Sequence, residues 1–350
     1  ADEVSILAGV RHGVTTGAPV SIRIGNSEWP KWETVMSADP VDPSALLIDA
    51  GTGDEREIAR NRPLTRPRPG HADLPGMLSY DLPEARPVLE RASARETAAR
   101  VALGALAEAL LKQVAGVRLV SHVIAVGTQR TNSEVVPTPA DENALCEASM
   151  RTLDTADNAR FEAAVDEAKH AGDTIGGVVE VIAYGVPVGL GTHVTARERL
   201  DARLAAALMS IQSVKGVEIG DGFAQAALLG SAAHDEIVRG ADGHLTRTTN
   251  HAGGIEGGTS NGAPIVARAG FKPISTVPRA LRSVDLATGE EAVGLHQRSD
   301  TCQVVPGAVI AEAEVALVLA DALFDHAGGR SVAEMRRNLS SYLEVVGERA

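Results

Sequence analysis

Apolar residues along this chain recur with two periods, one typical of strands and one typical of helices. Residues 20–24 alternate between apolar and polar positions, and residues 4–10 are apolar enough to pair with them, so we expect two strands with a turn over residues 15–19. Further on, the pattern predicts β-rich segments over residues 119–126, 177–188, 265–269 and 304–310, and helices over residues 94–115, 161–171, 200–209, 311–325 and 331–345. Strands and helices that do not alternate strictly indicate an α+β fold rather than a doubly wound sheet.

The most regular of these predicted helices covers residues 94–115. Ser93 and Glu96 have the spacing of a capping box at its start, and Gly116 is a typical helix-ending residue. Its apolar positions predict one buried face, formed by Val101, Leu106, Leu110 and Val114.

Two stretches show neither period. Residues 37–87 are rich in Pro, Gly, Asp and Arg, and we interpret them as a long ordered loop region, while residues 129–158 are polar and irregular. Loops of that length inside a compact domain are often functional. The chemistry is therefore expected in these stretches and at their edges.

The net charge of −13 argues against general binding to nucleic acid or anionic membranes, which requires a basic surface. No run of about 18 apolar residues is present, so we expect no membrane span. The two cysteines, Cys146 and Cys302, fit no metal-ligand spacing and make no disulfide framework. A reducing compartment, and hence a cytoplasmic location, is the simplest interpretation.

Arginine is locally enriched in this acidic chain. The window from 56 to 100 holds nine arginines against six acidic residues: Arg56, Arg60, Arg62, Arg66, Arg68, Arg86, Arg91, Arg95 and Arg100. Because a guanidinium fork binds carboxylate and phosphate in a planar geometry, the cluster suggests a polyanionic small ligand. A solvated loop with intramolecular ion pairs explains the same pattern equally well, so both interpretations stay open.

His71 lies in the segment Arg66-Pro-Arg-Pro-Gly-His-Ala-Asp73, where two prolines and a glycine restrict the backbone around a single histidine. A rigid loop that presents a histidine beside an arginine suits proton delivery to a phosphate leaving group. The alternative is a histidine that hydrogen-bonds Asp73 to hold the loop. Glycine-rich segments over residues 215–222 and 253–258 match no phosphate-binding spacing and are typical of tight turns.

Several segments, in this order along the chain, carry a resemblance to a known family. They are residues 66–73, 91–100 (Arg-Ala-Ser-Ala-Arg-Glu-Thr-Ala-Ala-Arg), 172–180, 215–223 (Lys-Gly-Val-Glu-Ile-Gly-Asp-Gly-Phe), 250–254 and 272–276 (Lys-Pro-Ile-Ser-Thr). Together they resemble chorismate synthase over roughly residues 4–343. The resemblance implies one domain over residues 1–350, with a helical layer between two four-stranded antiparallel sheets, assembled as a homotetramer.

The resemblance also implies an activity. Members of the family are carbon–oxygen lyases of the shikimate pathway, which leads to the aromatic amino acids. It converts 5-enolpyruvylshikimate 3-phosphate to chorismate by a 1,4-elimination of phosphate that needs reduced FMN, with NADPH as a possible reductant. A substrate with one phosphate and two carboxylates would explain the arginines.

The roles of individual residues are likewise carried over from the family. Arg68 and Arg95 would bind the anionic groups of the substrate, His71 would protonate the departing phosphate, and Asp300 would assist proton removal. The flavin would be lined by Ala92, Ser93, Ala94, Gln212, Ser213, Gly257, Lys272, Pro273, Ile274, Ser275, Thr276 and Arg298.

The chain departs from the family pattern in places. The family's opening Gly-Glu-Ser-His-Gly segment and the arginine run that follows it are not in this sequence, so we expect them upstream of Ala1. Residues 46–55 look like a loop insertion, and the family's Arg-His-Asp-Pro-Cys is Arg-Ser-Asp-Thr-Cys here, at residues 298–302. A non-catalytic homologue that binds flavin or phosphate is the second hypothesis.

Overall fold

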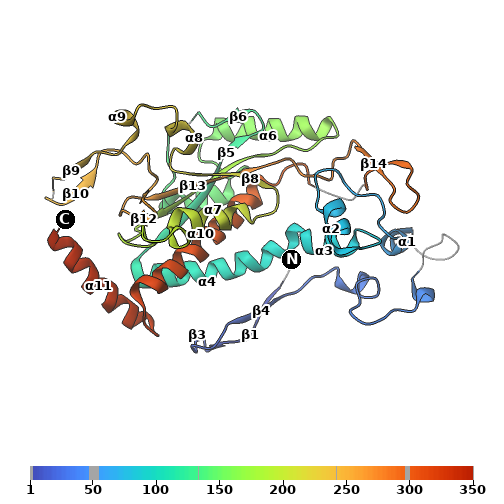
Figure 1. The fold of residues 1–350 in the computed structure, drawn as a ribbon, viewed down its shortest axis with the longest axis horizontal. Helices are drawn as coiled ribbons and strands as arrows, with labels where there is room; N and C mark the ends of the chain where they lie inside the picture. The colour runs from blue at the N-terminus through green and yellow to red at the C-terminus, as the bar shows by residue number, and fades with distance from the viewer. Residues whose placement is uncertain (1–2, 47–54, 133, 242, 296–299, 350) are drawn as a thin grey trace. The chain divides into compact units, whose positions relative to one another are not determined.

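The computed structural model of the protein describes residues 3–46, 55–132, 134–241, 243–295 and 300–349. The chain divides into two compact units (Figure 1): unit 1 is Ala1–Ala99 with Ala280–Gln297, and unit 2 is Arg100–Arg279 with Arg298–Ala350. The single domain expected over residues 1–350 stays a prediction.

Unit 1 is built from short elements. Its strands are β1 (Val4–Ala8), β2 (Val10–Arg11), β3 (Val14–Thr15), β4 (Ser21–Ile24), β14 (Arg282–Val284) and β15 (Glu291–Val293); its helices are η1 (Trp29–Lys31), η2 (Pro43–Ala45), α1 (Glu55–Asn61), α2 (Asp73–Tyr80), α3 (Arg86–Ala92) and η3 (Ala94–Glu96). The two predicted N-terminal strands are confirmed, because β1 and β4 pair antiparallel. Leu64, Met77 and Ala85 form a small buried core.

The prediction of a loop over residues 37–87 is wrong, because α1, α2 and the start of α3 lie there. Each of these helices is only seven or eight residues long. Two turns are too few for a helical period to emerge from the sequence, and the packing of Met77 on Leu64 and Ala85 stabilises them instead. The proposed insertion at residues 46–55 lies almost entirely outside the described residues.

Unit 2 contains the main sheet and the long helices. Its strands are β5 (Arg118–Val126), β6 (Gln129–Arg130), β7 (Gly177–Tyr184), β8 (Val214–Ile219), β9 (Ile237–Arg239), β10 (Leu245–Arg247), β11 (Ile255–Glu256), β12 (Thr259–Ser260) and β13 (Ile265–Phe271). Its helices are most of α4 (Thr97–Ala115), η4 (Pro139–Asp141), α5 (Glu142–Glu147), α6 (Thr155–His170), η5 (Ala196–Glu198), α7 (Leu200–Met209), α8 (Gly222–Gln225), α9 (Gly230–Ala233), α10 (Val304–Ala327) and α11 (Val332–Arg349). The predicted helices over residues 94–115, 161–171, 200–209 and 331–345 are confirmed within a few residues.

The main sheet has five antiparallel strands in the order β6-β5-β7-β13-β8. Helices α7 and α10 cover one of its faces (Figure 1), and Leu200, Leu204 and Leu208 of α7 are fully buried there, as the sequence predicts. The α+β class is therefore confirmed. The two expected four-stranded sheets are not confirmed, since the described residues form one five-stranded sheet and five two-stranded ones.

The predicted strand over residues 304–310 is wrong, because these residues form the first two turns of α10. The run is apolar at almost every position, so its period cannot distinguish a buried strand from a buried helix. Pro306 falls in the first helical turn, where its missing N–H has no partner to lose. Most of α10 is buried, which explains why its sequence lacks a polar face.

The start of α4 differs slightly from the prediction. Ser93 accepts a hydrogen bond from the backbone N–H of Arg95 and so caps the 3₁₀ turn η3, after which α4 begins at Thr97. The predicted apolar face is also rotated, because Leu106 is 40% exposed whereas Gly104 and Leu111 are buried. None of the helices in the described ranges is long and apolar enough to cross a membrane.

Candidate functional site

The loop that precedes α2 places Arg68, His71 and Asp73 in one hydrogen-bonded cluster. Nε and Nη2 of Arg68 donate to the Asp73 carboxylate over 2.8 and 3.0 Å, and the backbone N–H of Arg68 donates to it over 3.0 Å. Nδ1 of His71 lies 2.6 Å from Oδ1 of Asp73, the oxygen that also accepts from Nη2 of Arg68. Asp73 is completely buried and the His71 side chain is 19% exposed. The carboxylate thus holds both candidate side chains of the loop, Arg68 and His71.

The charge state of Asp73 decides which nitrogen of His71 carries a proton. Burial alone would raise the pKa of Asp73, but hydrogen bonds from His71 and Arg68 outweigh it and hold that pKa well below its ordinary value. An ionised Asp73 can only accept, so Nδ1 of His71 donates to it. Nε2, which lies 3.3 Å from Nη2 of Arg68, is then the ring nitrogen that can exchange a proton with other groups, as a general acid must. The structural hydrogen bond to Asp73 and an acid role for His71 are therefore compatible.

The hairpin of β14 and β15 and the residues beside it contact the loop that carries Arg68 and His71. Ser283 donates its hydroxyl to the carbonyl of Pro67 over 2.6 Å, and the N–H of Leu286 donates to the carbonyl of Thr65 over 3.0 Å. Gly294 approaches Pro69 so closely that a Cβ on Gly294 would lie 3.1 Å from the proline ring. Residues more than 200 positions away along the chain thus fix the backbone that presents His71.

Ala92, Ser93 and Ala94 form the junction between α3 and η3 in the same unit. Ala92 ends α3, and Ser93 has an extended backbone conformation that turns the chain into η3. Arg95 is exposed, and its Nη2 donates to the side-chain oxygen of Asn26 over 2.9 Å. Several other arginines of the enriched window make intramolecular contacts, as the interpretation of a solvated loop with intramolecular ion pairs predicts. Arg86 donates to the carbonyl of Arg62, Arg91 pairs with Glu96, and Arg100 pairs with Glu314.

In unit 2 the predicted flavin segments gather at one end of the main sheet. The N–H of Lys272, which directly follows β13, donates to the carbonyl of Ser213 over 2.9 Å, so residues 212–213 and 272–276 are neighbours. The hydroxyl of Thr174 donates to the carbonyl of Ile274 over 2.8 Å. The next residue, Ile175, contacts the segment 300–302, because its N–H donates a hydrogen bond to the carbonyl of Thr301 over 3.0 Å.

Two features of residues 212–213 and 272–276 suit a polar ligand. Nζ of Lys272 donates to Oγ of Ser275 over 3.3 Å, and burial together with the nearby charge of Lys215 lowers the pKa of Lys272. Ser213 has a φ of 71°, a left-handed conformation that a serine adopts only when its surroundings impose it. Strained backbone of this kind is common at ligand sites. Asp300, which directly precedes Thr301 in the sequence, is exposed.

Gly257, the other predicted flavin residue that the structure describes in unit 2, is not part of this group. Gly257 lies in the turn between β11 and β12, where its nearest neighbour is His193 and Thr259 bridges to Gly191. The loop that carries Gly191 follows β7, at the sheet edge where Ile265 starts β13. That edge is about 20 Å from the far end of the seven-residue β13, at about 3.3 Å per residue. Arg298 lies outside the described residues.

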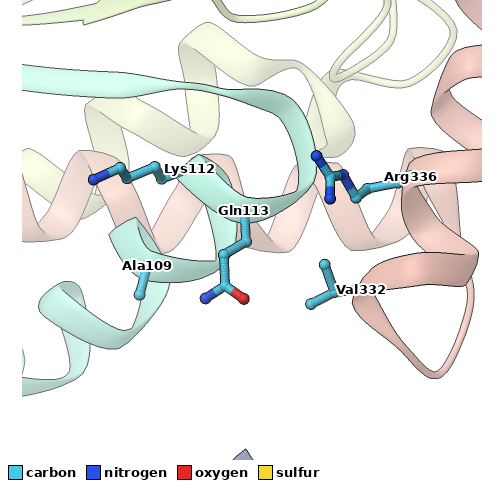
Figure 2. A pocket seen from close by; sticks show the side chains of 5 residues that line it. All are labelled: Ala109, Lys112, Gln113, Val332 and Arg336. Carbon is cyan, nitrogen blue, oxygen red and sulfur yellow. The ribbon is translucent and has the colours of Figure 1, made fainter.

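No group of three or more His, Cys, Asp or Glu side chains in the described part of the chain could hold a metal ion. A surface cavity of about 530 Å³ lies between α4 and α11 and holds none of the predicted site residues (Figure 2). Lys112 and Arg336 line it together with Ala109, Gln113 and Val332, but the Lys112 side chain points away from Arg336. The two cations therefore do not converge on a common ligand position.

Sequence reasoning missed the residues that hold the site together. Asp73 was expected only as the partner in the structural alternative, whereas it binds both Arg68 and His71. Thr174 gave no signal, although it lies in a segment that carries the family resemblance. A carboxylate two residues after a histidine in a proline-rich loop is a pattern that could have revealed Asp73, but the contact of Thr174 depends on how distant strands pack.

Comparison with known proteins identifies the family of this chain. A family model described as chorismate synthase matches residues 1–324. The chorismate synthase of Beutenbergia cavernae is 61% identical over 348 residues, which is 99% of this chain and 86% of the relative. That of Mycobacteroides abscessus is 56% identical over 349 residues, covering 100% of this chain and 82% of the relative. A solved crystal structure of chorismate synthase superposes with a TM-score of 0.75 at 33% identity, covering 99% of this chain and 85% of that chain. The chain belongs to the chorismate synthase family.

Proposed function

We propose that this chain catalyses the chorismate synthase reaction, the 1,4-elimination of phosphate from 5-enolpyruvylshikimate 3-phosphate. The observation that carries the proposal is the 61% identity to a chorismate synthase across 99% of the chain. The cluster of Arg68, His71 and Asp73 adds a physical reason, because it places a cation and a proton donor on one rigid loop. The non-catalytic alternative is not favoured, since the loop retains the groups that the chemistry needs.

In the elimination, a C–O bond to phosphate breaks, a proton leaves the ring carbon, and a new double bond forms, so no net oxidation occurs. Arg68 and Arg95 would bind the anionic groups of the substrate, because a guanidinium pairs well with phosphate and carboxylate. His71 would donate a proton from Nε2 to the departing phosphate, while Asp73 stabilises the charged ring through Nδ1. Asp300 would assist removal of the ring proton.

The cofactor we propose is reduced FMN. When bound, reduced flavin would supply electron density for the breaking of the C–O bond without being consumed. The gathering of residues 212–213 and 272–276 fits such a group, because it offers the cationic Nζ of Lys272 and the hydroxyl of Ser275 beside strained backbone at Ser213. Ala92, Ser93 and Ala94 are proposed from the family resemblance alone, as are Gly257 and Arg298.

The test is anaerobic turnover by the full-length protein with reduced FMN and 5-enolpyruvylshikimate 3-phosphate, followed by phosphate release and chorismate absorbance together. Both signals should appear, and they should vanish with oxidised FMN. Phosphate release without chorismate would contradict the proposal. Replacing the chemical reductant with NADPH tests whether the protein reduces its own flavin.

Ligand binding can be tested without turnover. Because a ligand that binds only the folded state stabilises it, reduced FMN and substrate at about 100 times their dissociation constants should each add about 2.7 kcal/mol and raise the melting temperature. No shift at saturating ligand would argue for a protein without a flavin site.

We further propose a homotetramer in the cytoplasm, with the family's sandwich of two four-stranded sheets around helices completed in that assembly. Leu103 and Leu106 on α4 are 38% and 40% exposed, and Phe324 on α10 is 47% exposed, so unit 2 carries apolar surface for a partner chain. Light scattering should give about 145 kDa for four copies. Cys146 and Cys302 are free thiols, which fits a reducing compartment.

A further inference from the structure

The face of the main sheet opposite α7 and α10 contains a cavity of about 650 Å³. It lies entirely within unit 2 and includes none of the residues proposed above for substrate or flavin. Its floor is formed by strands β5, β7, β13 and β8, and its rim by Arg130, Thr131, Val135, Val136, Asp221, Phe223 and Ala224. A cavity of this size accommodates a small organic ligand.

A row of polar side chains crosses the floor of this cavity on four adjacent strands. His122, Glu180, Arg268 and Glu218 are successive cross-strand partners in the register of β5, β7, β13 and β8. Nε2 of His122 lies 2.9 Å from one oxygen of Glu180, and Nε of Arg268 donates to the other oxygen over 2.6 Å. Nη1 of Arg268 donates to the carbonyl of Gly220 over 2.6 Å. These bonds hold the row in one geometry.

The bonds within the row determine what it presents to a ligand. Burial would raise the pKa of Glu180, but the hydrogen bonds and charges of His122 and Arg268 outweigh it and lower that pKa. An ionised Glu180 accepts from Nε2 of His122 and from Nε of Arg268, and the side-chain oxygens of the adjacent Glu218 can accept from a ligand. Nη2 of Arg268 makes no hydrogen bond to any described residue. Donor and acceptor groups therefore stand side by side along one edge.

Next to this row the floor is bare backbone. Gly216 and Gly270 are cross-strand partners on β8 and β13, two residues along from Glu218 and Arg268. A Cβ on Gly216 would meet nothing within 4 Å, and one on Gly270 would come no closer than 3.7 Å to any atom outside its own chain neighbours. Packing therefore does not require glycine at either position. Glycine weakens a strand interior and often marks the place where a ligand approaches the backbone closely.

The rim of the cavity is apolar and aromatic. Phe223 is 80% exposed, and Val135 and Val136 are 63% and 59% exposed. A large exposed aromatic ring beside a flat floor offers a stacking surface for another ring. The charges of the lining nearly balance, because Arg130 and Arg268 oppose Glu180, Glu218 and Asp221, and Asp221 is itself paired with His251. The cavity thus has no strong preference for an anion or a cation.

We infer that this face of the sheet is a second binding site, for an uncharged planar heteroaromatic ring of nucleobase size. The ring lies flat on Gly216 and Gly270, and its edge exchanges hydrogen bonds with Arg268 and Glu218. Phe223 stacks on its open side. Rings of this class combine a flat apolar face with donors and acceptors at one edge, which is the pattern that the floor and the row complement.

The test uses 2-aminopurine, an uncharged fluorescent base, with the full-length protein carrying saturating FMN. Fluorescence titration should show one site, and binding should be at least tenfold weaker in Gly216→Val and in Gly270→Val, which fill the floor. Phe223→Ala should weaken binding by about tenfold through loss of stacking. Gly347→Val is the matched control, because a Cβ there also meets nothing within 4 Å and Gly347 lies on α11, outside the cavity.

Three outcomes would overturn the inference. The first is no binding of 2-aminopurine at millimolar concentration, and the second is equal binding by the filled variants and the wild type while their melting temperatures match. The third is binding of 2-aminopurine only when FMN is withheld, which would assign the probe to the flavin site. If instead the filled variants change the mass measured by light scattering and the wild type binds no probe, the face is an interface between chains.

Discussion

The guanidinium of Arg68 is held at two of its nitrogens by the fully buried carboxylate of Asp73, over 2.8 and 3.0 Å. Arg68 is itself only 7% exposed. Arg68, which the sequence suggests as a substrate ligand, is therefore also one partner of a structural ion pair. Its two roles can be separated by experiment, because one concerns the fork and the other the positive charge.

The first prediction concerns Arg68→Lys. A lysine keeps the charge but cannot form the two-nitrogen fork, so substrate affinity should fall by about tenfold or more, as a charge-assisted contact is worth about 1.5–3 kcal/mol. The melting temperature should fall as well, since breaking a buried ion pair costs up to about 3–5 kcal/mol. Calorimetric titration with substrate and thermal unfolding measure the two effects.

Asp73→Asn is the matched comparison for Arg68→Lys. It loosens the same fork while the cation of Arg68 remains, so the melting temperature should fall and substrate binding should be largely kept. Equal loss of substrate binding in both variants would show that order in the loop, and not contact with Arg68, controls affinity.

The second prediction concerns His71→Ala. If His71 protonates the departing phosphate, anaerobic turnover should fall by about 10²–10⁴-fold, the usual range for general acid catalysis. The melting temperature should change little, because Arg68 still donates three hydrogen bonds to Asp73. Near-normal turnover together with a lower melting temperature would instead make His71 a purely structural residue.

The third prediction is a pH dependence from Glu108 on α4. Burial, helped by the nearby charges of Glu312 and Glu142 and opposed by Arg118 and Arg151, raises the pKa of Glu108 to about 7. Between its ordinary pKa of 4.5 and about 7, the folded protein holds a proton that the unfolded chain has released. The free energy of unfolding should therefore decrease as pH rises through this window.

Glu108→Gln should remove this pH dependence and leave the protein more stable than the wild type at pH 8, as urea unfolding at several pH values would show. Glu147→Gln is the control, since Glu147 is exposed on the neighbouring α5. If the wild type and Glu108→Gln lose stability in parallel between pH 5 and 8, the carboxyl of Glu108 is not responsible.

The fourth prediction tests the crossing of α4 and α10. A Cβ on Gly104 would lie 2.4 Å from the Cβ of Ala313 and 2.7 Å from its Cα, so the two helices can approach only because residue 104 is glycine. Gly104→Ala should destabilise the fold by about 1–3 kcal/mol through overpacking, despite the higher helix propensity of alanine. Thermal and urea unfolding would measure this loss.

Gly347→Ala makes the same substitution in α11, where the new methyl meets nothing within 4 Å. It should leave stability unchanged or raise it by up to about 1 kcal/mol. A neutral Gly104→Ala variant would mean that the helices separate without cost and that the close crossing is not required.

Local pattern predicted the elements that are long and half-buried. The leucines of α7 repeat every four residues, and all three are buried against the sheet. The same approach failed for α10, whose first turns are apolar on every side, and for α1 and α2, which are too short for any period. It also predicted the wrong buried face for α4. Leu106 is more hydrophobic than Gly104 and was assigned to the core, but Gly104 is the residue at the helix crossing and Leu106 is exposed.

The sequence by itself determined the α+β class, the family and the loop that carries Arg68 and His71, because these depend on local periods and on contiguous motifs. Only the tertiary structure decided what those residues contact. Asp73 binds both of them, Thr174 reaches Ile274 a hundred residues further on, and four strands align His122, Glu180, Arg268 and Glu218 in one row. The physical reason is that hydrogen bonds and ion pairs act over about 3 Å in space, whatever the separation along the chain, and loop conformation and strand register together set which side chains come that close.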